Sequence, residues 1–277
     1  EMTDFTEIGQ RIVDMTKLDI PSGLLNKIKK LPELSKMTDS FPKPENNGPV
    51  TEITSNSASF DNIPILKSWP NDAGRFITLG LVATKHPDTG IRNLGVYRIQ
   101  IVDSTHALMH WQKHKRGAHH GEIAKEKGEK IEAAIIIGCE PATIFSSIAP
   151  VPEGLDKYLF AGITRRKGIK TVKCKTVDLE VPANAEIVFE GYVDQYDIRD
   201  EGPFGDHTGY YTPIEPYPTF TLTGIMRRKN PIYVTTVVGK PVLEDAYIGK
   251  VIERSFLPLI RMFHPEIVDF SMPSAGW

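Results

Sequence analysis

Segments with the alternating pattern of β-strands occupy most of the chain between residues 75 and 238, and only short helices interrupt them. We expect strands at residues 76–83, 96–102, 107–111, 132–137, 170–175, 185–195, 218–227 and 232–238. Short helices are expected at residues 119–127, 142–147 and 155–165. This mixture is typical of an α+β chain built on a partly opened β-barrel. The last two strands are neighbours in the sequence, so we expect them to pair as an antiparallel hairpin.

Helices are predicted on both sides of this region. Residues 4–18 and 243–262 carry apolar side chains at helical spacing, and a further helix is expected at residues 22–30, before Pro32. Residues 38–60 are rich in Ser, Asn and Pro and lack periodicity, which predicts a long connector. The predicted domains are a helical and connecting segment at 1–72, a barrel domain at 73–238 and the start of a C-terminal α/β domain at 239–277.

Both ends of the sequence suggest a longer protein. The chain opens at Glu1 rather than at methionine, and it stops at Trp277, soon after an apolar, strand-like run at residues 267–270. We therefore expect this sequence to be an excerpt of a longer protein whose C-terminal domain continues beyond it.

Charge and composition exclude several classes of protein. Lys and Arg number 33 against 35 Asp and Glu, a net charge of −2, which argues against a nucleic-acid-binding surface. Cys139 and Cys174 lie in apolar contexts and indicate reduced, buried thiols in a cytoplasmic protein. No apolar run approaches the roughly 20 residues needed to span a bilayer.

The run at residues 200–211 carries the strongest functional signal. Its sequence, Asp-Glu-Gly-Pro-Phe-Gly-Asp-His-Thr-Gly-Tyr-Tyr, places Glu201 and Asp206 on either side of a Gly-Pro-Phe-Gly turn. The glycines permit backbone angles closed to other residues, and proline fixes its own φ, so the loop can hold both acids at one site. Two carboxylates held close together suit proton transfer. The simpler interpretation is a polar surface turn.

Five blocks of sequence, taken in order, closely resemble the UbiD family of prenylated-flavin decarboxylases. They are Asn-Leu-Gly-Val-Tyr-Arg at 93–98, Pro-Val-Pro-Glu-Gly at 150–154, the Cys-Lys-Thr-Val-Asp-Leu-Glu-Val-Pro run at 174–182, Glu-Ile-Val-Phe-Glu-Gly at 186–191, and the acidic loop itself. The resemblance extends from about residue 74 to residue 277, and the branch most similar acts on 3-polyprenyl-4-hydroxybenzoate in quinone biosynthesis. It implies a split β-barrel of the flavin-reductase type.

The resemblance implies a prenylated FMN cofactor. It places the flavin contacts at Val96, Tyr97, Arg98, His110, Trp111, Gln112, Lys115 and Arg116. Lys115 and Arg116 offer the positive charge that a flavin phosphate needs. Without the resemblance, residues 93–98 read as an ordinary loop-to-strand junction. The histidine-rich run at 110–120 would read as a solvated basic loop or, less readily, as a zinc site on His110 and His114.

The resemblance also implies a divalent metal ion, manganese or magnesium, with a potassium ion as a further expectation. Its ligands would include Asn93 and His119. The chain departs from the family at Lys157, where a metal-binding glutamate is expected. Three alternatives follow: Asp156 replaces the glutamate, the metal binds weakly, or the ammonium group of Lys157 neutralises the flavin phosphate directly.

The implied catalytic residues are Arg98, Glu201 and Asp206. The resemblance makes Asp206 the proton donor, while Arg98 holds Glu201 ionised and orients the substrate carboxylate. We expect the neighbouring His207 to be a loop residue bonded to the backbone.

The leading hypothesis is a decarboxylase of an aromatic acid of the 3-polyprenyl-4-hydroxybenzoate type. It implies a flavin prenyltransferase as cofactor supplier, a homo-oligomer, and peripheral contact with the inner face of the membrane. Two alternatives remain within the family: a flavin-binding split-barrel protein without lyase activity, and a decarboxylase of another aromatic or unsaturated acid. A scaffold domain that binds nothing is the alternative from a different class.

Overall fold

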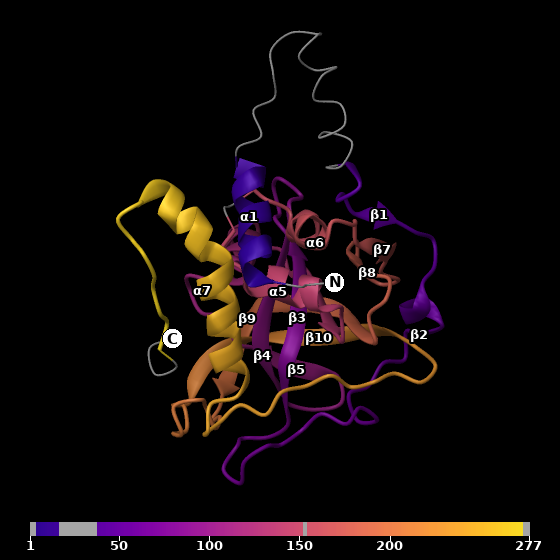
Figure 1. Cartoon of the computed structure of the whole chain (residues 1–277). Coiled ribbons are helices and arrows are strands. Elements are labelled where there is room, and N and C mark those ends of the chain that lie inside the picture. The colour runs from indigo at the N-terminus through magenta and orange to yellow at the C-terminus, as the bar shows by residue number, and fades with distance from the viewer. Residues whose placement is uncertain (1–3, 17–37, 152–153, 274–277) are drawn as a thin grey trace.

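A closed β-barrel forms the centre of the protein (Figure 1). The computed structural model describes residues 4–16, 38–151 and 154–273. The barrel strands are β3 (Phe76–Lys85), β4 (Arg92–Ile101), β5 (His106–Met109), β6 (Ile131–Ile137), β9 (Ile187–Glu201) and β10 (Glu215–Arg227). They run in the order β10-β5-β4-β3-β6-β9, each antiparallel to its neighbours, and the pairing of β9 with β10 closes the circle. The expected α+β split-barrel class is confirmed.

Strand β6 shows how the sequence builds two cores around this barrel. Successive side chains of a strand point to opposite faces. Ile135 and Ile137 lie in the barrel core, whereas Ala134 and Ile136 belong to a second core outside it. A strand that is buried on both faces has to be apolar throughout, which explains the continuous apolar run in the sequence.

The predicted hairpin between residues 218–227 and 232–238 is wrong. Residues 232–238 form no strand, and the partner of β10 is β9, which pairs with it along its length. The other edge of β10 is taken by β5 and by the short strand β2 (Ile53–Ser55). Because both edges are occupied, the chain after β10 instead lies against β3, where Thr78 Oγ1 accepts a hydrogen bond from Thr236 N at 3.3 Å.

The predicted connector at residues 38–60 contains more structure than its composition indicates. It supplies β1 (Lys43–Pro44), a 3-10 turn (Pro49–Thr51) and β2. Strand β1 pairs in parallel with β7 (Lys170–Lys173), which pairs in turn with β8 (Glu180–Pro182). The predicted helix at residues 22–30 lies outside the described residues.

The helices of the described residues are α1 (Phe5–Thr16), α4 (Arg116–Glu126), α5 (Pro141–Ile148), α6 (Lys157–Arg165) and α7 (Glu244–Phe263). Helix α4 packs on the barrel core through Ala118 and Ala124, whereas the other four form a third core. Helices α1 and α7 lie side by side although they come from opposite ends of the chain (Figure 1). Their apolar faces meet α5 and α6 through Ile8, Phe145, Phe160 and Phe256. The three-domain division stays a prediction.

We expect Gly191→Ala to destabilise the barrel where β9 pairs with β10. A Cβ atom at this position would lie 2.0 Å from the backbone carbonyl oxygen of Thr221, and relieving that clash requires a shift of the strand backbone. Overpacking of this kind costs about 1–3 kcal/mol of unfolding free energy, occasionally more. Urea denaturation measures the change. Gly74→Ala is the matched control, because its Cβ would meet only an ordinary contact at 3.5 Å. Equal midpoints for the two variants would contradict the expectation.

Candidate active site

A buried ion pair between Arg98 and Glu201 forms the centre of the candidate site. Arg98 Nε donates to Glu201 Oε1 at 2.8 Å, and Nη2 donates to Oε2 at 2.9 Å, so the pair is bidentate. The Glu201 side chain is 0% exposed and that of Arg98 is 13% exposed. The barrel brings them together, since Arg98 lies on β4 and Glu201 is the last residue of β9, 103 residues later.

Two side chains on the same face of β4 hold the start of the acidic loop in place. Arg98 and Gln100 are two residues apart and therefore share a face of the strand. Arg98 holds Glu201, and Gln100 Oε1 accepts a hydrogen bond from the backbone N–H of Gly202 at 2.7 Å. One strand thus holds both the acid and the first residue of the turn that follows it.

The surroundings of Glu201 favour its ionised form. Burial by itself would raise the pKa of this carboxyl, but hydrogen bonds from His110 and Arg98 hold the pKa below its ordinary value. His110 Nδ1 lies 3.2 Å from Glu201 Oε2, and the His110 ring packs against Tyr217 with a centroid separation of 4.2 Å. A carboxylate with these partners is held in its ionised form.

Asp206 lies at the other end of the loop and is partly open to solvent. Its Oδ2 is 3.8 Å from Arg98 Nη1, so one guanidinium faces both acids. Its Oδ1 accepts from the backbone N–H of His207 at 2.7 Å and lies 2.9 Å from the imidazole Nδ1 of the same residue. The imidazole of His207 therefore contacts a carboxylate, and the expectation that it bonds to the backbone is wrong.

The two glycines of the Gly-Pro-Phe-Gly turn are required for different reasons. Gly202 has a φ of +95°, which side-chain-bearing residues rarely adopt. Gly205 is needed for space, because a Cβ there would lie 2.4 Å from Trp69 Cδ1. Asp72, which is buried, accepts from Gly205 N at 2.8 Å and so ties the loop to the segment before β3.

Four residues of this network escaped the sequence analysis. Asp72, Glu215, Tyr217 and Asp245 all lie outside the quoted motifs. Tyr217 OH donates to Glu215 Oε2 at 3.0 Å, and Asp245 Oδ2 lies 3.7 Å from His207 Nδ1. Nothing in the local sequence marks them, because only the closed barrel and helix α7 bring them to the loop.

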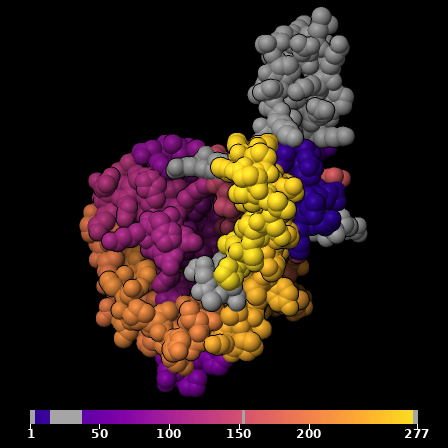
Figure 2. Space-filling view, turned by 60° about the vertical axis from the view of Figure 1, so that its left-hand side comes forward, coloured from indigo at the N-terminus to yellow at the C-terminus, as the bar shows by residue number. Residues whose placement is uncertain are grey.

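A cavity of ≈530 Å³ lies near this centre, because its lining includes Tyr97, which precedes Arg98 on β4, and Asp245, which is 3.7 Å from His207. Figure 2 shows α7, in yellow, along the edge of a hollow in the surface. The cavity is lined by β4, by the start of α4, by residues 147–151 at the end of α5 and just after it, and by the first residue of α6. Helix α7 contributes Asp245, Ile248 and Ile252. Its volume is in the range of small-molecule sites.

The cavity lining is strongly cationic. His114, Lys115, Arg116 and Lys157 all line it, and of its described lining residues only Asp245 carries a carboxylate. Arg116 Nη2 donates to the carbonyl of Val151, and Lys157 Nζ donates to the carbonyl of Ala149 at 2.7 Å. Such a lining suits a phosphate or another anion.

Lys157 is a buried ammonium group without a carboxylate partner in the hydrogen bonds of the described residues. Only 6% of the residue is exposed. Burial, together with the nearby charges of Arg116 and Lys115, lowers the pKa of Lys157 to about 7. An anion in the cavity would oppose these effects and favour the charged amine.

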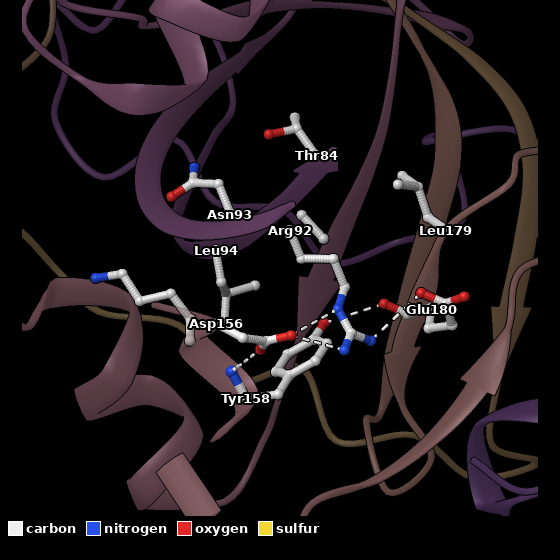
Figure 3. A pocket seen from close by; sticks show the side chains of 10 residues that line it. Thr84, Arg92, Asn93, Leu94, Asp156, Tyr158, Leu179 and Glu180 are labelled. Carbon is white, nitrogen blue, oxygen red and sulfur yellow. Dashed lines mark hydrogen bonds and ion pairs between the residues drawn. The ribbon is translucent and has the colours of Figure 1, made fainter. Parts of the chain in front are cut away.

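Both carboxylate oxygens of Asp156 already accept two hydrogen bonds each, which leaves neither of them to bind a metal ion. Its Oδ2 accepts from Arg92 Nε at 3.0 Å and Nη2 at 2.7 Å, and Figure 3 shows the guanidinium of Arg92 between Asp156 and Glu180. Its Oδ1 caps helix α6 by accepting from Tyr158 N at 2.7 Å and from Leu159 N at 3.3 Å. Asp156 is therefore a structural residue that fixes the start of α6.

The predicted flavin contacts divide into separate groups. Val96, Tyr97, Lys115 and Arg116 line the cavity. Arg98 and His110 contact Glu201 instead. Trp111 is buried in the barrel core, and Gln112 is exposed.

The two predicted metal ligands lie in different surroundings. Asn93 lines the cavity beside Lys157, is 4% exposed, and has an amide nitrogen with no hydrogen-bond partner among the described residues. His119 is exposed on α4, and its ring centroid is 6.2 Å from that of His86. The binding of one metal ion by Asn93 and His119 stays a prediction. Within residues 4–16, 38–151 and 154–273, no group of three or more His, Cys, Asp or Glu is placed to hold a metal.

His120, next in the sequence to His119, is a structural histidine. It is buried, and its Nδ1 lies 3.0 Å from Thr84 Oγ1. Burial lowers the pKa of His120 to about 4, with smaller contributions from the charges of His86, His119 and Arg116. It is therefore neutral at pH 7.

Fold and site together define a barrel protein with a buried arginine–carboxylate centre beside a cation-lined cavity. Comparison with known families agrees with this class: the sequence model of the UbiD family, described as the 3-octaprenyl-4-hydroxybenzoate carboxy-lyase Rift-related domain, matches residues 43–241. The chain belongs to the UbiD family. None of the helices formed by the described residues is long and apolar enough to cross a membrane.

Relatives of this chain are found in archaea and bacteria. An uncharacterized protein of Archaeoglobus fulgidus is 50% identical over 277 residues, which are 100% of this chain and 57% of that protein. One from Aquifex aeolicus is 50% identical over 98% of this chain and 56% of its own length. The chain thus spans little more than half the length of these relatives.

Solved structures of UbiD-class enzymes share the fold. HmfF from Pelotomaculum thermopropionicum, in complex with prenylated FMN, superposes with a TM-score of 0.78 at 28% identity, over 87% of this chain and 58% of that one. Vanillic acid decarboxylase of Sedimentibacter hydroxybenzoicus, in its closed form, gives a TM-score of 0.80 at 25% identity, over 94% and 57%.

Proposed function

We propose that this protein takes part in the non-oxidative decarboxylation of an aromatic acid with prenylated FMN as cofactor. The observation that carries the proposal is the juxtaposition of Arg98, Glu201 and Asp206 with a cavity lined by Lys115, Arg116 and Lys157. One part of the site handles a carboxylate and a proton, and the other accepts an anionic cofactor. HmfF, which has been solved with prenylated FMN, supports the choice of cofactor.

The chain's own residues have distinct tasks in this proposal. Val96 and Tyr97 border the cavity in which the flavin lies, and Lys115, Arg116 and Lys157 face its phosphate. When bound, prenylated FMN supplies the electrophile that weakens the bond between the substrate and its carboxylate. Arg98 orients the substrate carboxylate from its fixed position on Glu201.

Asp206 supplies the proton that the reaction consumes. Decarboxylation converts R–COO⁻ and H⁺ to R–H and CO₂, so one proton is needed at the carbon that loses the carboxylate. Glu201 is held ionised by Arg98 and His110, whereas Asp206 is only partly buried and faces the same guanidinium. We therefore assign proton delivery to Asp206.

The substrate and its context are finer parts of the proposal. We place the substrate in the 3-polyprenyl-4-hydroxybenzoate class of quinone biosynthesis, with another aromatic or unsaturated acid as the alternative. A flavin prenyltransferase would supply the cofactor, and the protein would act as a cytoplasmic homo-oligomer in peripheral contact with the membrane. Exposed apolar side chains such as Tyr210, Ile214 and Tyr247 support contacts of this kind.

A flavin-binding protein without lyase activity is the second candidate. Lys157 favours it, because the chain departs here from the expected metal-binding glutamate. Retained cofactor without release of CO₂ from any aromatic acid would support this candidate over the first.

FMN binding tests the proposal directly. We expect the 277-residue chain to quench FMN fluorescence on binding and to bind riboflavin about 10- to 100-fold more weakly, because riboflavin lacks the phosphate that forms charge-assisted hydrogen bonds. Fluorescence titration gives both dissociation constants. Equal affinity for the two ligands would contradict placing the phosphate in the cationic cavity, and binding of neither would refute the flavin site.

A further inference from the structure

We propose that the ammonium group of Lys157 takes the place of a divalent metal ion, so that the phosphate of the cofactor binds in this cavity without metal. The inference rests on the proposed flavin site and specifies which charges hold the phosphate. It selects one of the three alternatives that the sequence leaves open.

Among the described residues, the acids and histidines around the cavity do not form a metal site. Both oxygens of Asp156 are engaged, one by Arg92 and one by the first backbone N–H groups of α6. His119 is exposed beside His86 and does not line the cavity. A hard cation prefers several oxygen ligands, and the described lining offers a single carboxylate, that of Asp245.

The donors that do line the cavity fit an anion. Lys157 and Arg116 are anchored by the carbonyls of Ala149 and Val151, which come from the same segment after α5. Asn93 adds a buried amide N–H₂ without an acceptor. Charged and neutral donors from three separate elements therefore surround one space.

Charge balance makes an additional divalent ion unfavourable. Lys115 and Arg116 bring positive charge to this space and would repel a metal ion, and an anion in the cavity favours the charged form of Lys157 as well. A phosphate monoester carries a charge of about −1.5 to −2 near pH 7, which these side chains neutralise by themselves. The ammonium group of Lys157 thus supplies, as part of the protein, positive charge that a bound metal ion would otherwise supply to the phosphate.

Fluorescence titration with FMN, in EDTA and then in Mn²⁺, tests the inference. The native chain should bind FMN with the same dissociation constant, within about twofold, under both conditions. Lys157→Glu should lose at least about tenfold in FMN affinity in EDTA, the loss of one charge-assisted contact, and should recover it in Mn²⁺. Electron paramagnetic resonance should detect bound Mn²⁺ in Lys157→Glu and not in the native chain.

Two controls keep the result interpretable. Lys113→Glu makes the same change of charge at an exposed lysine that does not line the cavity, and its FMN binding should remain independent of metal. Lys157→Met removes the charge and provides no oxygen, so its weakened FMN binding should not recover in Mn²⁺. Circular dichroism establishes that each variant is folded.

The outcomes separate this inference from the proposed function. FMN binding by the native chain only in the presence of Mn²⁺ overturns the inference and leaves the flavin site standing. Failure to bind FMN under either condition overturns both. Lys157→Met that binds FMN as tightly as the native chain also overturns the inference, because the ammonium would then contribute nothing.

Discussion

Asp206→Asn is expected to lower the rate of decarboxylation by about 10²–10⁴-fold, the usual loss when a general acid is removed, while the flavin content is unchanged. Asparagine keeps the shape of the side chain and removes its transferable proton. Asp206 does not line the cationic cavity, so its replacement should leave cofactor binding intact. Release of CO₂ and absorbance of the bound flavin, measured on the same cofactor-loaded protein, separate the two effects.

Solvent deuterium gives a second measure of the same step. If the proton that replaces the carboxylate comes through Asp206, the exchange of solvent deuterium into added product, which needs the proton transfer but no release of CO₂, should fall together with the rate. Asp200→Asn is the matched control: it makes the same substitution at an exposed carboxylate at the start of the same loop. Near-native turnover by Asp206→Asn would assign proton delivery elsewhere, and Glu201 would become the candidate.

The sequence predicts the acidic loop well because its geometry is local. Gly202 at positive φ and the two acids around the turn can all be read within a few residues. It does not reveal Asp72, which ties the loop down through Gly205 N from 133 residues away. Contacts between residues so far apart in the sequence form only when the barrel closes. The periodicity of the sequence does not show which two strands pair to close it.

The wrong hairpin has the same physical origin. Residues 218–227 and 232–238 are apolar neighbours, and a local view favours their pairing. The fold instead uses both edges of β10 for β9 and for β5 with β2. The preference of residues for extended structure shows which segments form strands. Which strands pair depends on which of them occupies each edge of a neighbouring strand, and that is decided by the whole fold.

Residues that are close in the sequence can also lie in different parts of the candidate site. Lys115 and Arg116 line the cavity from the N-terminus of α4, and their contact with the flavin phosphate stays a prediction. His119, a few residues further along the same helix, projects to an exposed surface beside His86. Residues three or four positions apart lie on the same face of a helix. They are one turn apart along the helix axis, however, so they can face different surroundings.

Arg98→Met is expected to cost stability as well as activity. It leaves the Glu201 carboxylate, 0% exposed, without its bidentate partner, and breaking a buried ion pair in this way lowers the free energy of unfolding by about 3–5 kcal/mol. Flavin content and turnover should both fall, because Arg98 follows the residues on β4 that we propose to contact the flavin and faces both acids. Urea denaturation, flavin absorbance and CO₂ release measure the three effects.

The pH dependence of this loss identifies its cause. The pKa of Glu201 lies below its ordinary value in the folded protein, so the pair contributes stability above the unfolded carboxyl pKa of about 4.3, and that contribution is lost as pH falls through the folded pKa. Removal of Arg98 raises the pKa of the buried Glu201 carboxyl, so the difference between native protein and Arg98→Met should be largest near pH 7 and shrink as falling pH protonates Glu201, first in the variant and then in the native protein. The double variant Arg98→Met/Glu201→Leu, which removes the stranded charge, should regain much of the stability and none of the turnover. An Arg98→Met protein that unfolds at the native urea concentration would mean that His110 alone compensates the buried carboxylate.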